Sequence, residues 1–299
     1  MPANTVLPAI SGTPQVGQTL VGFNGTWANG PTSFTYQWQR AAPTPNVSNF
    51  STASESTITV DGKPFINRNA NKAWSITNPD SQTLIYEVRS GDKWAPDTPG
   101  KERSISDGPG TMFPPGTEVN VSYNFMMTSP TVRTVSTFFD IAQFHNNDTE
   151  LGGSTSPPFE IDLQPNDQMN ITIGWLTAHP SSITSISNQM VNGVNISYGY
   201  AFQDTVNIVR GHNYAMRIQC KVDPTAGFLN VWRDGVQVVN YSGPLGFNFD
   251  TYWANGIYRA AGPDTQIAQF QNLIITTGPY SLGTASTYMP IGECTDSHG

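Results

Sequence analysis

Two short segments of the sequence place side chains that transfer protons at regular spacings. Gln143 and His145 are two residues apart, so in a β-strand their side chains point to the same face. Tyr252 and Tyr258 are six positions apart, an even spacing that places both side chains on one face of a strand in the same way. Histidine and tyrosine both serve as general acids and bases. The sequence therefore contains a candidate acid–base set, if the fold brings the two segments together.

Four blocks, taken in order along the chain, carry a resemblance to a known family. They are YEVRSGDKW (86–94) with KERS (101–104), AQFH (142–145), LNVWRDG (229–235) and YWANGIYR (252–259). In their order and spacing, residues 57–278 resemble the heparin-lyase-like polysaccharide lyases, relatives of the jelly-roll alginate lyases. The resemblance implies a concanavalin-like jelly-roll β-sandwich that cleaves a uronate-containing, acidic polysaccharide by β-elimination.

β-Elimination of a uronic acid defines the side chains that such a site needs. The C5 proton becomes acidic only when the adjacent carboxylate is neutralised, and the leaving O4 must be protonated. An arginine and an amide are therefore expected at the carboxylate, with a histidine and a tyrosine at the sugar. On the resemblance, Gln143 and Arg103 would bind the carboxylate. His145 would act as base or base partner, and Tyr258 as acid, or as both acid and base.

Further substrate-binding residues are expected from the same blocks. They are Arg89, Lys93, Trp94, Tyr252 and Arg259. Arg89 is the alternative to Arg103 at the carboxylate, and an exposed tryptophan would stack on a sugar. The last block departs from the alginate-lyase form at Ala254, where those enzymes have a lysine. The loss of that cation predicts weaker catalysis or a different class of substrate.

Each of these residues also has an ordinary structural interpretation. Gln143 and His145 would equally be polar residues on the outer face of a sandwich, and Tyr258 an aromatic residue of a concave sheet. The arginines would instead be solvated or paired with neighbouring acidic residues, which are Glu87, Glu102 and Asp264.

The elements that must position these residues are short β-strands. Runs of β-branched and aromatic residues closed by Gly, Pro, Asn or Asp predict strands at 57–60, 83–88, 118–125, 134–144, 169–175, 214–222, 228–232, 236–241 and 267–276. A hairpin is predicted to turn at Asp234-Gly235, because a tight turn needs the positive φ that glycine adopts freely. Many strands at this spacing predict an all-β, double-sheet sandwich.

The first 40 residues follow a different pattern. LPAISGTPQVGQTL (7–20), GTW (25–27) and YQWQR (36–40) resemble the opening of the immunoglobulin-like repeats of bacterial surface and phage virion proteins. The pattern stops after Arg40, which predicts a partial Ig-like β segment at 1–40, a linker at 41–56, the jelly roll at 57–278 and a tail at 279–299. Because half a module leaves an open core, Trp27 or Trp38 is expected to be buried against another surface.

Composition excludes some classes of function. Only 12% of the 299 residues are charged and the net charge is −8, which argues against broad binding to nucleic acid or to an anionic membrane. No apolar run approaches the ~20 residues of a membrane span. The polar, weakly charged surface is typical of extracellular and virion β-proteins, so an extracellular or virion-surface location is expected. The N-terminus lacks signal-peptide features, which favours a removed signal or release by lysis.

No cofactor is expected. The four histidines lack metal-ligand spacing, and a structural calcium ion in the polar loop containing Asn146, Asn147, Asp148 and Glu150 is the alternative to a solvated turn. Cys220 is most simply a small buried residue, with a Cys220–Cys294 disulfide as the alternative.

Two functions from different classes remain open on the sequence. The first is a polysaccharide lyase, for example a phage depolymerase or a secreted enzyme. The second is a non-catalytic virion or surface protein, such as a capsid-decorating or tail-associated subunit, that uses the fold for assembly with copies of itself or other subunits, or for weak glycan adhesion. Convergence of the candidate side chains on one cleft would favour the enzyme.

Overall fold

The structure, a computed structural model, describes residues 3–6, 9–11, 21–28, 46–132, 137–147, 150, 152–176, 183 and 185–279. The chain divides into two compact units, one of Met1–Thr44 with Tyr280–Gly299 and the other of Pro45–Pro279. In the first unit, β1 (Ala3–Val6) pairs with β4 (Thr26–Ala28), and β2 (Ala9–Ser11) pairs with β3 (Val21–Phe23).

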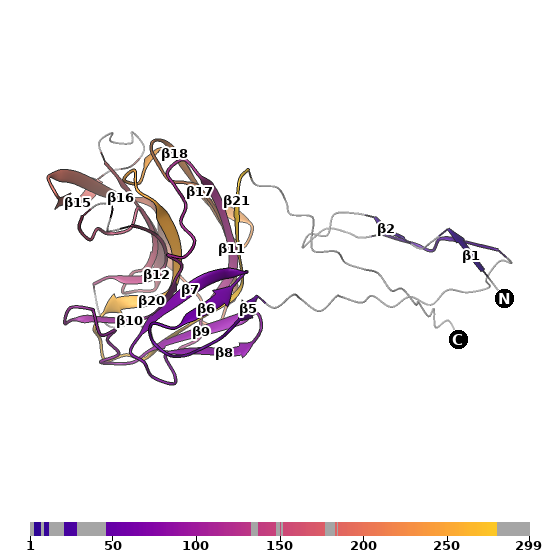
Figure 1. The fold of residues 1–299 in the computed structure, drawn as a ribbon, viewed down its shortest axis with the longest axis horizontal. Helices are drawn as coiled ribbons and strands as arrows, with labels where there is room; N and C mark the ends of the chain where they lie inside the picture. Colours follow the sequence, from indigo (N-terminus) through magenta and orange to yellow (C-terminus); the bar gives the residue numbers. More distant parts are fainter. Residues whose placement is uncertain are drawn as a thin grey trace. The chain divides into compact units, whose positions relative to one another are not determined.

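The second unit is a sandwich of two curved antiparallel sheets (Figure 1). The ten-stranded sheet has the order β15 (Ser185–Val191), β16 (Val194–Asn207), β14 (Gln168–Trp175), β13 (Phe159–Leu163), β12 (Phe139–Asn146), β20 (Thr251–Ala260), β10 (Lys101–Asp107), β7 (Lys63–Asn69), β6 (Thr57–Val60) and β5 (Val47–Ser48). The seven-stranded sheet has the order β19 (Val236–Leu245), β18 (Asp223–Arg233), β17 (Tyr214–Lys221), β11 (Glu118–Met127), β21 (Gln266–Thr277), β9 (Thr83–Val88) and β8 (Ile76–Asp80). The predicted all-β jelly roll is confirmed.

The predicted strands correspond to observed ones within a few residues. The predicted strand at 134–144 differs at its start. The observed strand β12 begins at Phe139, and residues 133–136 lie outside the described part of the chain. The predicted hairpin joins β18 to β19, with Arg233 paired to Val236 and φ angles of 50° at Asp234 and 79° at Gly235. Two consecutive positive φ angles give the turn the twist that matches its strands.

An aromatic cluster fills the space between the two sheets. Trp253 of β20 lies 5.2 Å from Phe144 of β12 and 5.8 Å from Tyr123 of β11, measured between ring centroids. Tyr123 in turn lies 5.4 Å from Phe270 of β21. All four side chains are buried. Because side chains alternate along a strand, the residues between them on β12 and β20 face away from this core.

The sandwich begins earlier than the sequence predicted. β5 lies within the expected linker at 41–56, pairs with β6 and buries Val47. The Asn46 side chain also donates a hydrogen bond to the carbonyl of Leu273 at 2.5 Å. Residues 46–56 therefore belong to the sandwich, and the predicted boundary at residue 57 is wrong. Two backbone hydrogen bonds from Asn46 and Val47 to Ser81 fix this start.

The first unit gives a partial answer about the N-terminal prediction. Trp27 is half-buried and its indole N–H donates to the carbonyl of Asn24 at 2.8 Å, whereas Val21 and Phe23 are exposed. Trp38 and the predicted C-terminal tail beyond Pro279 lie outside the described residues. The immunoglobulin-like interpretation stays a prediction.

Two smaller expectations concern the cysteines and the membrane. Cys220 is a buried free thiol, and Cys294, its partner in the alternative disulfide, lies outside the described residues. Burial raises the pKa of the Cys220 thiol above its usual range. In the part of the chain that the structure describes, no helix has the length and apolar character needed to cross a membrane.

Candidate active site on the outer face of the ten-stranded sheet

The central strands β12 and β20 carry the candidate residues on the outer face, defined here as the face directed away from the seven-stranded sheet. Their register pairs His145 with Tyr252, Gln143 with Ala254 and Asp140 with Tyr258. Directly paired residues of antiparallel strands project to the same side. The candidate acid–base residues therefore share one face, as the sequence spacing predicted.

A β-bulge between β12 and β20 adds Asp140 to this face. Between Asp140 and Ala142 of β12, the partner strand advances by an extra residue, from Tyr258 to Asn255. The bulge includes Gly256, whose φ is 136° and where a Cβ atom would collide with the carbonyl oxygen of Ser104. β12 also carries an extra residue against β13, because Asp140 pairs with Asp162 and Ala142 with Ile161, and its consecutive residues Ile141 and Ala142 both face the core. Asp140 and Gln143 consequently both lie on the outer face, although they are three residues apart.

Strand β10 adds a cation to the same row. Arg103 is paired with Tyr258, and its guanidinium carbon lies 4.0 Å from the centroid of the Tyr258 ring. Its Nε donates to Asp97 Oδ2 at 2.6 Å. The ammonium nitrogen of Lys101 lies 5.7 Å from the same ring. The structure thus brings Arg103 and Tyr258 together, and fixes the arginine with a buried carboxylate.

Trp94 is placed beside this row by two arginines. Its ring lies 4.8 Å from the guanidinium of Arg103 and 5.0 Å from that of Arg68. Its indole N–H donates to Glu55 at 2.6 Å, and the neighbouring Lys93 ammonium donates to the carbonyl of Ala95 at 3.1 Å. Trp94 therefore has a fixed orientation and remains partly exposed.

The environment of His145 determines which of its nitrogens is free. Nδ1 lies 2.8 Å from the carbonyl oxygen of Asn146, which can only accept. We therefore assign the proton to Nδ1, which leaves the lone pair on Nε2. The imidazole stacks on Tyr252 at 5.6 Å with an interplanar angle of 26°. His145 is thereby held as a base with an available nitrogen.

His145 and Tyr258 occupy different ends of the candidate site. The partner of Tyr258, Asp140, lies five residues before His145 on β12, which is roughly 16 Å at ~3.3 Å per residue. Gln143 lies between them. One sugar ring can contact both groups only if their side chains lean toward Gln143. The described geometry therefore groups Tyr258 with Arg103, and His145 with Tyr252.

Two predicted substrate-binding residues are elsewhere. Arg259 faces the interior, is 2% exposed and pairs with Glu102 at 2.7 Å, so its predicted contact with substrate is wrong. Arg89 follows β9 of the seven-stranded sheet, pairs with Glu87 at 2.5 Å and lies 4.0 Å from the Trp74 ring. The structure does not bring Arg89 to the outer face of the ten-stranded sheet. Arg89 and Arg259 both form ion pairs, as the structural interpretation predicted.

Asp107 is a residue of this face that the sequence analysis missed. It is buried, is paired with Ala254, and accepts from Arg68 Nε at 3.3 Å. Its Oδ1 has no hydrogen-bond partner within the described chain. Burial raises the pKa of Asp107, against the opposing effects of Arg68, Arg103 and His145. Its even spacing from Arg103 along β10 was the signal that could have revealed it.

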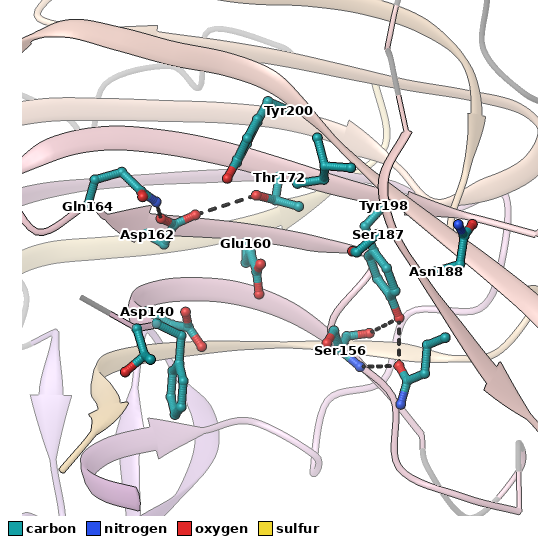
Figure 2. A pocket seen from close by; sticks show the side chains of 14 residues that line it. Asp140, Ser156, Glu160, Asp162, Gln164, Thr172, Ser187, Asn188, Tyr198 and Tyr200 are labelled. Atoms are coloured by element: carbon teal, nitrogen blue, oxygen red, sulfur yellow. Dashed lines mark hydrogen bonds between the residues drawn. The ribbon is translucent and has the colours of Figure 1, made fainter. Parts of the chain in front are cut away.

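A second missed feature is a pocket beside this set, shown in Figure 2. Its volume is about 420 Å³, and its lining includes Asp140, Glu160, Asp162, Thr172, Tyr198 and Tyr200. Burial, with the nearby charges of Asp140 and then Asp162, raises the pKa of Glu160 well above its usual range. No local pattern in the sequence indicates this pocket, because its residues come from the five strands β12 to β16 and from adjoining loops.

The polar loop proposed as a calcium site is internally bonded where it is described. Asn147 donates to Glu150 at 2.9 Å, and Asn146 accepts from Thr155 at 2.7 Å. Asp148 lies outside the described residues. Among the residues that are described, no group of three or more His, Cys, Asp or Glu side chains is arranged to hold a metal ion. The calcium alternative stays a prediction.

The outer face of the jelly roll thus presents aromatic, proton-transfer and cationic side chains together. The family described as polysaccharide lyase matches residues 52–274, which is most of the chain, and the chain therefore belongs to the polysaccharide lyase family. No curated protein sequence matches the chain.

Among solved structures, this chain is similar to an alginate lyase from Klebsiella pneumoniae, with 13% identity over 69% of this chain and 85% of that one, and a TM-score of 0.47. It is also similar to a marine PL7 alginate lyase from Zobellia galactanivorans, with 10% identity over 79% and 96% of the two chains and a TM-score of 0.46. An alginate lyase from Chlorella virus shows 13% identity over 72% and 93%, with a TM-score of 0.43.

Proposed function

We propose that this protein cleaves a uronate-containing polysaccharide by β-elimination on the outer face of β10, β20 and β12. The observation that carries the proposal is the register that sets Tyr258 against Arg103 and places Gln143 and His145 on the same face. Membership of the polysaccharide lyase family supports it. Alginate, the substrate named for the similar structures, is one polymer of this class.

The reaction requires one proton abstraction and one proton delivery. A base removes the C5 proton, the electron pair forms the C4–C5 double bond, and the C4–O4 bond breaks as O4 takes a proton. Gln143 and Arg103 would bind the carboxylate, because an amide and a guanidinium stabilise the charge that develops there. Tyr258 would protonate O4, and its distance from His145 leaves two candidates for the base.

These two candidates are His145 Nε2 and Tyr258 itself. His145 would act directly if its side chain and that of Tyr258 lean toward Gln143 around one sugar. Tyr258 would act as both base and acid if His145 serves a neighbouring sugar through its stack with Tyr252. Ala254, between Gln143 and Asp107, supplies no cation in either case. The carboxylate would then depend on the β10 cations Arg103 and Lys101 for positive charge in this row.

Single substitutions test the proposal and separate the two candidates. We expect Tyr258→Phe to lower turnover by about 10²–10⁴-fold, the usual contribution of a general acid or base. His145→Ala should cost as much if His145 is the base, and should mainly raise KM if it holds a neighbouring sugar. The measurement is absorbance of the unsaturated product formed from a panel of uronate polymers.

The control is His212→Ala. His212 is exposed and bonded to Asp234 at 2.9 Å, away from the outer face. The His212→Ala substitution should therefore leave turnover unchanged. If no uronate polymer yields an unsaturated product with the folded protein, the lyase proposal is refuted.

A non-catalytic role in glycan adhesion is the second candidate. It is favoured by ion pairs that already engage two arginines of this region. Arg103 pairs with Asp97, and Arg68 pairs with Glu55 and Asp107. It would be identified by polymer binding without product. Under either role we propose an extracellular or virion-surface setting, as a phage depolymerase, a secreted enzyme or a virion subunit, supported by the weakly charged composition.

A further inference from the structure

We propose that the pocket beside the candidate site is a subsite for a sugar ring that bears no acid group. The substrate would then be a heteropolysaccharide in which the cleaved uronate adjoins such a sugar, and not a polymer of uronate alone. This inference rests on the proposed function, because it assigns the uronate to the row of Arg103 and Tyr258.

The strand register places the pocket next to that row. Asp140 is paired with Tyr258 on one side and with Asp162 on the other, and Gln143 is paired with Glu160. Neighbouring strands are ~4.8 Å apart, and the pocket begins at Asp140 of β12, one strand spacing from Tyr258 of β20. A chain lying across the strands would therefore enter the pocket with the sugar next to the uronate. The volume of about 420 Å³ falls in the range of roughly 300–1,000 Å³ seen for small-molecule sites.

Charge is divided unequally along the outer face. The cations Lys101 and Arg103 lie on β10, on the far side of Tyr258 from the pocket. The pocket itself carries three carboxyl groups, those of Asp140, Glu160 and Asp162, and its lining includes no Lys, Arg or His. A uronate or sulfate entering the pocket would meet like charge without a cation. By repelling acidic sugars, the pocket would select a sugar without an acid group, a selection that the cationic row of Arg103 cannot make.

The pocket retains hydrogen-bonding groups that suit sugar hydroxyls. Asp162 accepts from Gln164 at 2.5 Å and from Thr172 at 3.4 Å, which fixes its carboxylate (Figure 2). Glu160 makes no hydrogen bond to the other pocket residues drawn in Figure 2, where its carboxyl points into the pocket. Burial and nearby carboxylates raise the pKa values of both Glu160 and Tyr200.

The pKa values of Glu160 and Tyr200 are both raised, and in the protonated form each side chain donates a hydrogen bond, whereas the Asp162 carboxylate accepts. Hydroxyl groups can serve both kinds of partner, because each donates once and accepts twice. Tyr198 borders the same space and is held by the carbonyl of Ser156 at 3.1 Å, which adds an ordered aromatic wall. Because the described carboxylates are not arranged as a metal site, a bound cation does not explain them.

The test compares two kinds of uronate oligosaccharide. Wild-type protein is titrated calorimetrically with a homopolymeric uronate oligosaccharide and with an unsulfated oligosaccharide that alternates uronate with N-acetylhexosamine. We expect at least tenfold tighter binding of the alternating one. Asp162→Asn should reduce that preference several-fold by admitting the homopolymer, whereas Asp80→Asn, at an exposed carboxylate of β8, should leave it unchanged.

The outcomes separate this inference from the proposed function. Equal or tighter binding of the homopolymer, or a preference unaffected by Asp162→Asn, overturns the subsite. Preferential binding that depends on Asp162 without any unsaturated product supports the subsite and refutes the lyase. An alternating oligosaccharide with free amino groups is the third arm. If it binds tighter than the acetylated form, the acid-free sugar is an amino sugar; if not, it is an uncharged one.

Discussion

The buried ion pair between Arg259 and Glu102 gives the sharpest distinction between a structural and a substrate-binding arginine. The two side chains are 3% and 2% exposed, and Arg259 Nε and a terminal guanidinium nitrogen lie 2.9 and 2.7 Å from the Glu102 carboxylate. In Arg259→Met, that carboxylate would keep only the backbone N–H groups of Gly91 and Gly262, at 2.6 and 3.3 Å. An uncompensated buried charge should then remain.

The expected cost follows from this geometry. Removing one partner of a buried pair costs about 3–5 kcal/mol of unfolding free energy. For a domain of this size, each kcal/mol lowers Tm by ~2–4 °C, so Tm should fall by about 6–20 °C. Adding Glu102→Gln to Arg259→Met should restore part of the loss, because the double variant leaves no isolated charge.

Urea and thermal unfolding measure these changes, with Arg89→Met as the matched control. Arg89 pairs with Glu87 but its side chain is 46% exposed, so its loss should cost no more than about 1 kcal/mol. A loss below 1 kcal/mol in Arg259→Met, together with weaker substrate binding, would refute the buried assignment and restore Arg259 to the substrate-binding set.

Three further outcomes are expected. Gly256→Ala should lower the unfolding free energy by about 1–3 kcal/mol in urea titration, because φ is 136° and the new Cβ would collide with the backbone of Ser104; a neutral result would mean that the bulge is not rigid. Because the pKa of Glu160 is raised in the folded state, wild-type stability should fall as pH rises from the unfolded value of ~4.3 through the folded value. Glu160→Gln should lose that slope in unfolding titrations across pH, and an unchanged slope would contradict the assignment. Cys220 is buried with a raised pKa, so peptide mass spectrometry should find it modified by a thiol reagent only after unfolding, whereas labelling of the folded protein would show an open core.

The sequence by itself determined the strands and the side on which neighbouring residues lie. Alternation is a local property, so the shared face of Gln143 and His145 could be predicted from a spacing of two. The Asp234-Gly235 hairpin was predictable for the same reason, since a two-residue turn is specified by its own residues. The resemblance of the ordered blocks added the family, which the match over 52–274 shows.

Only the tertiary structure decided which residues meet across strands. Arg103 and Arg259 both lie in matched blocks, yet one contacts Tyr258 and the other pairs with Glu102 in the interior. The register of β10 against β20 determines this result, and it depends on pairing between segments more than a hundred residues apart. The pocket around Glu160 arises in the same way. Its three carboxyl groups come together only after β12 and β13 are aligned, because Asp140 lies on β12 and Glu160 and Asp162 lie on β13.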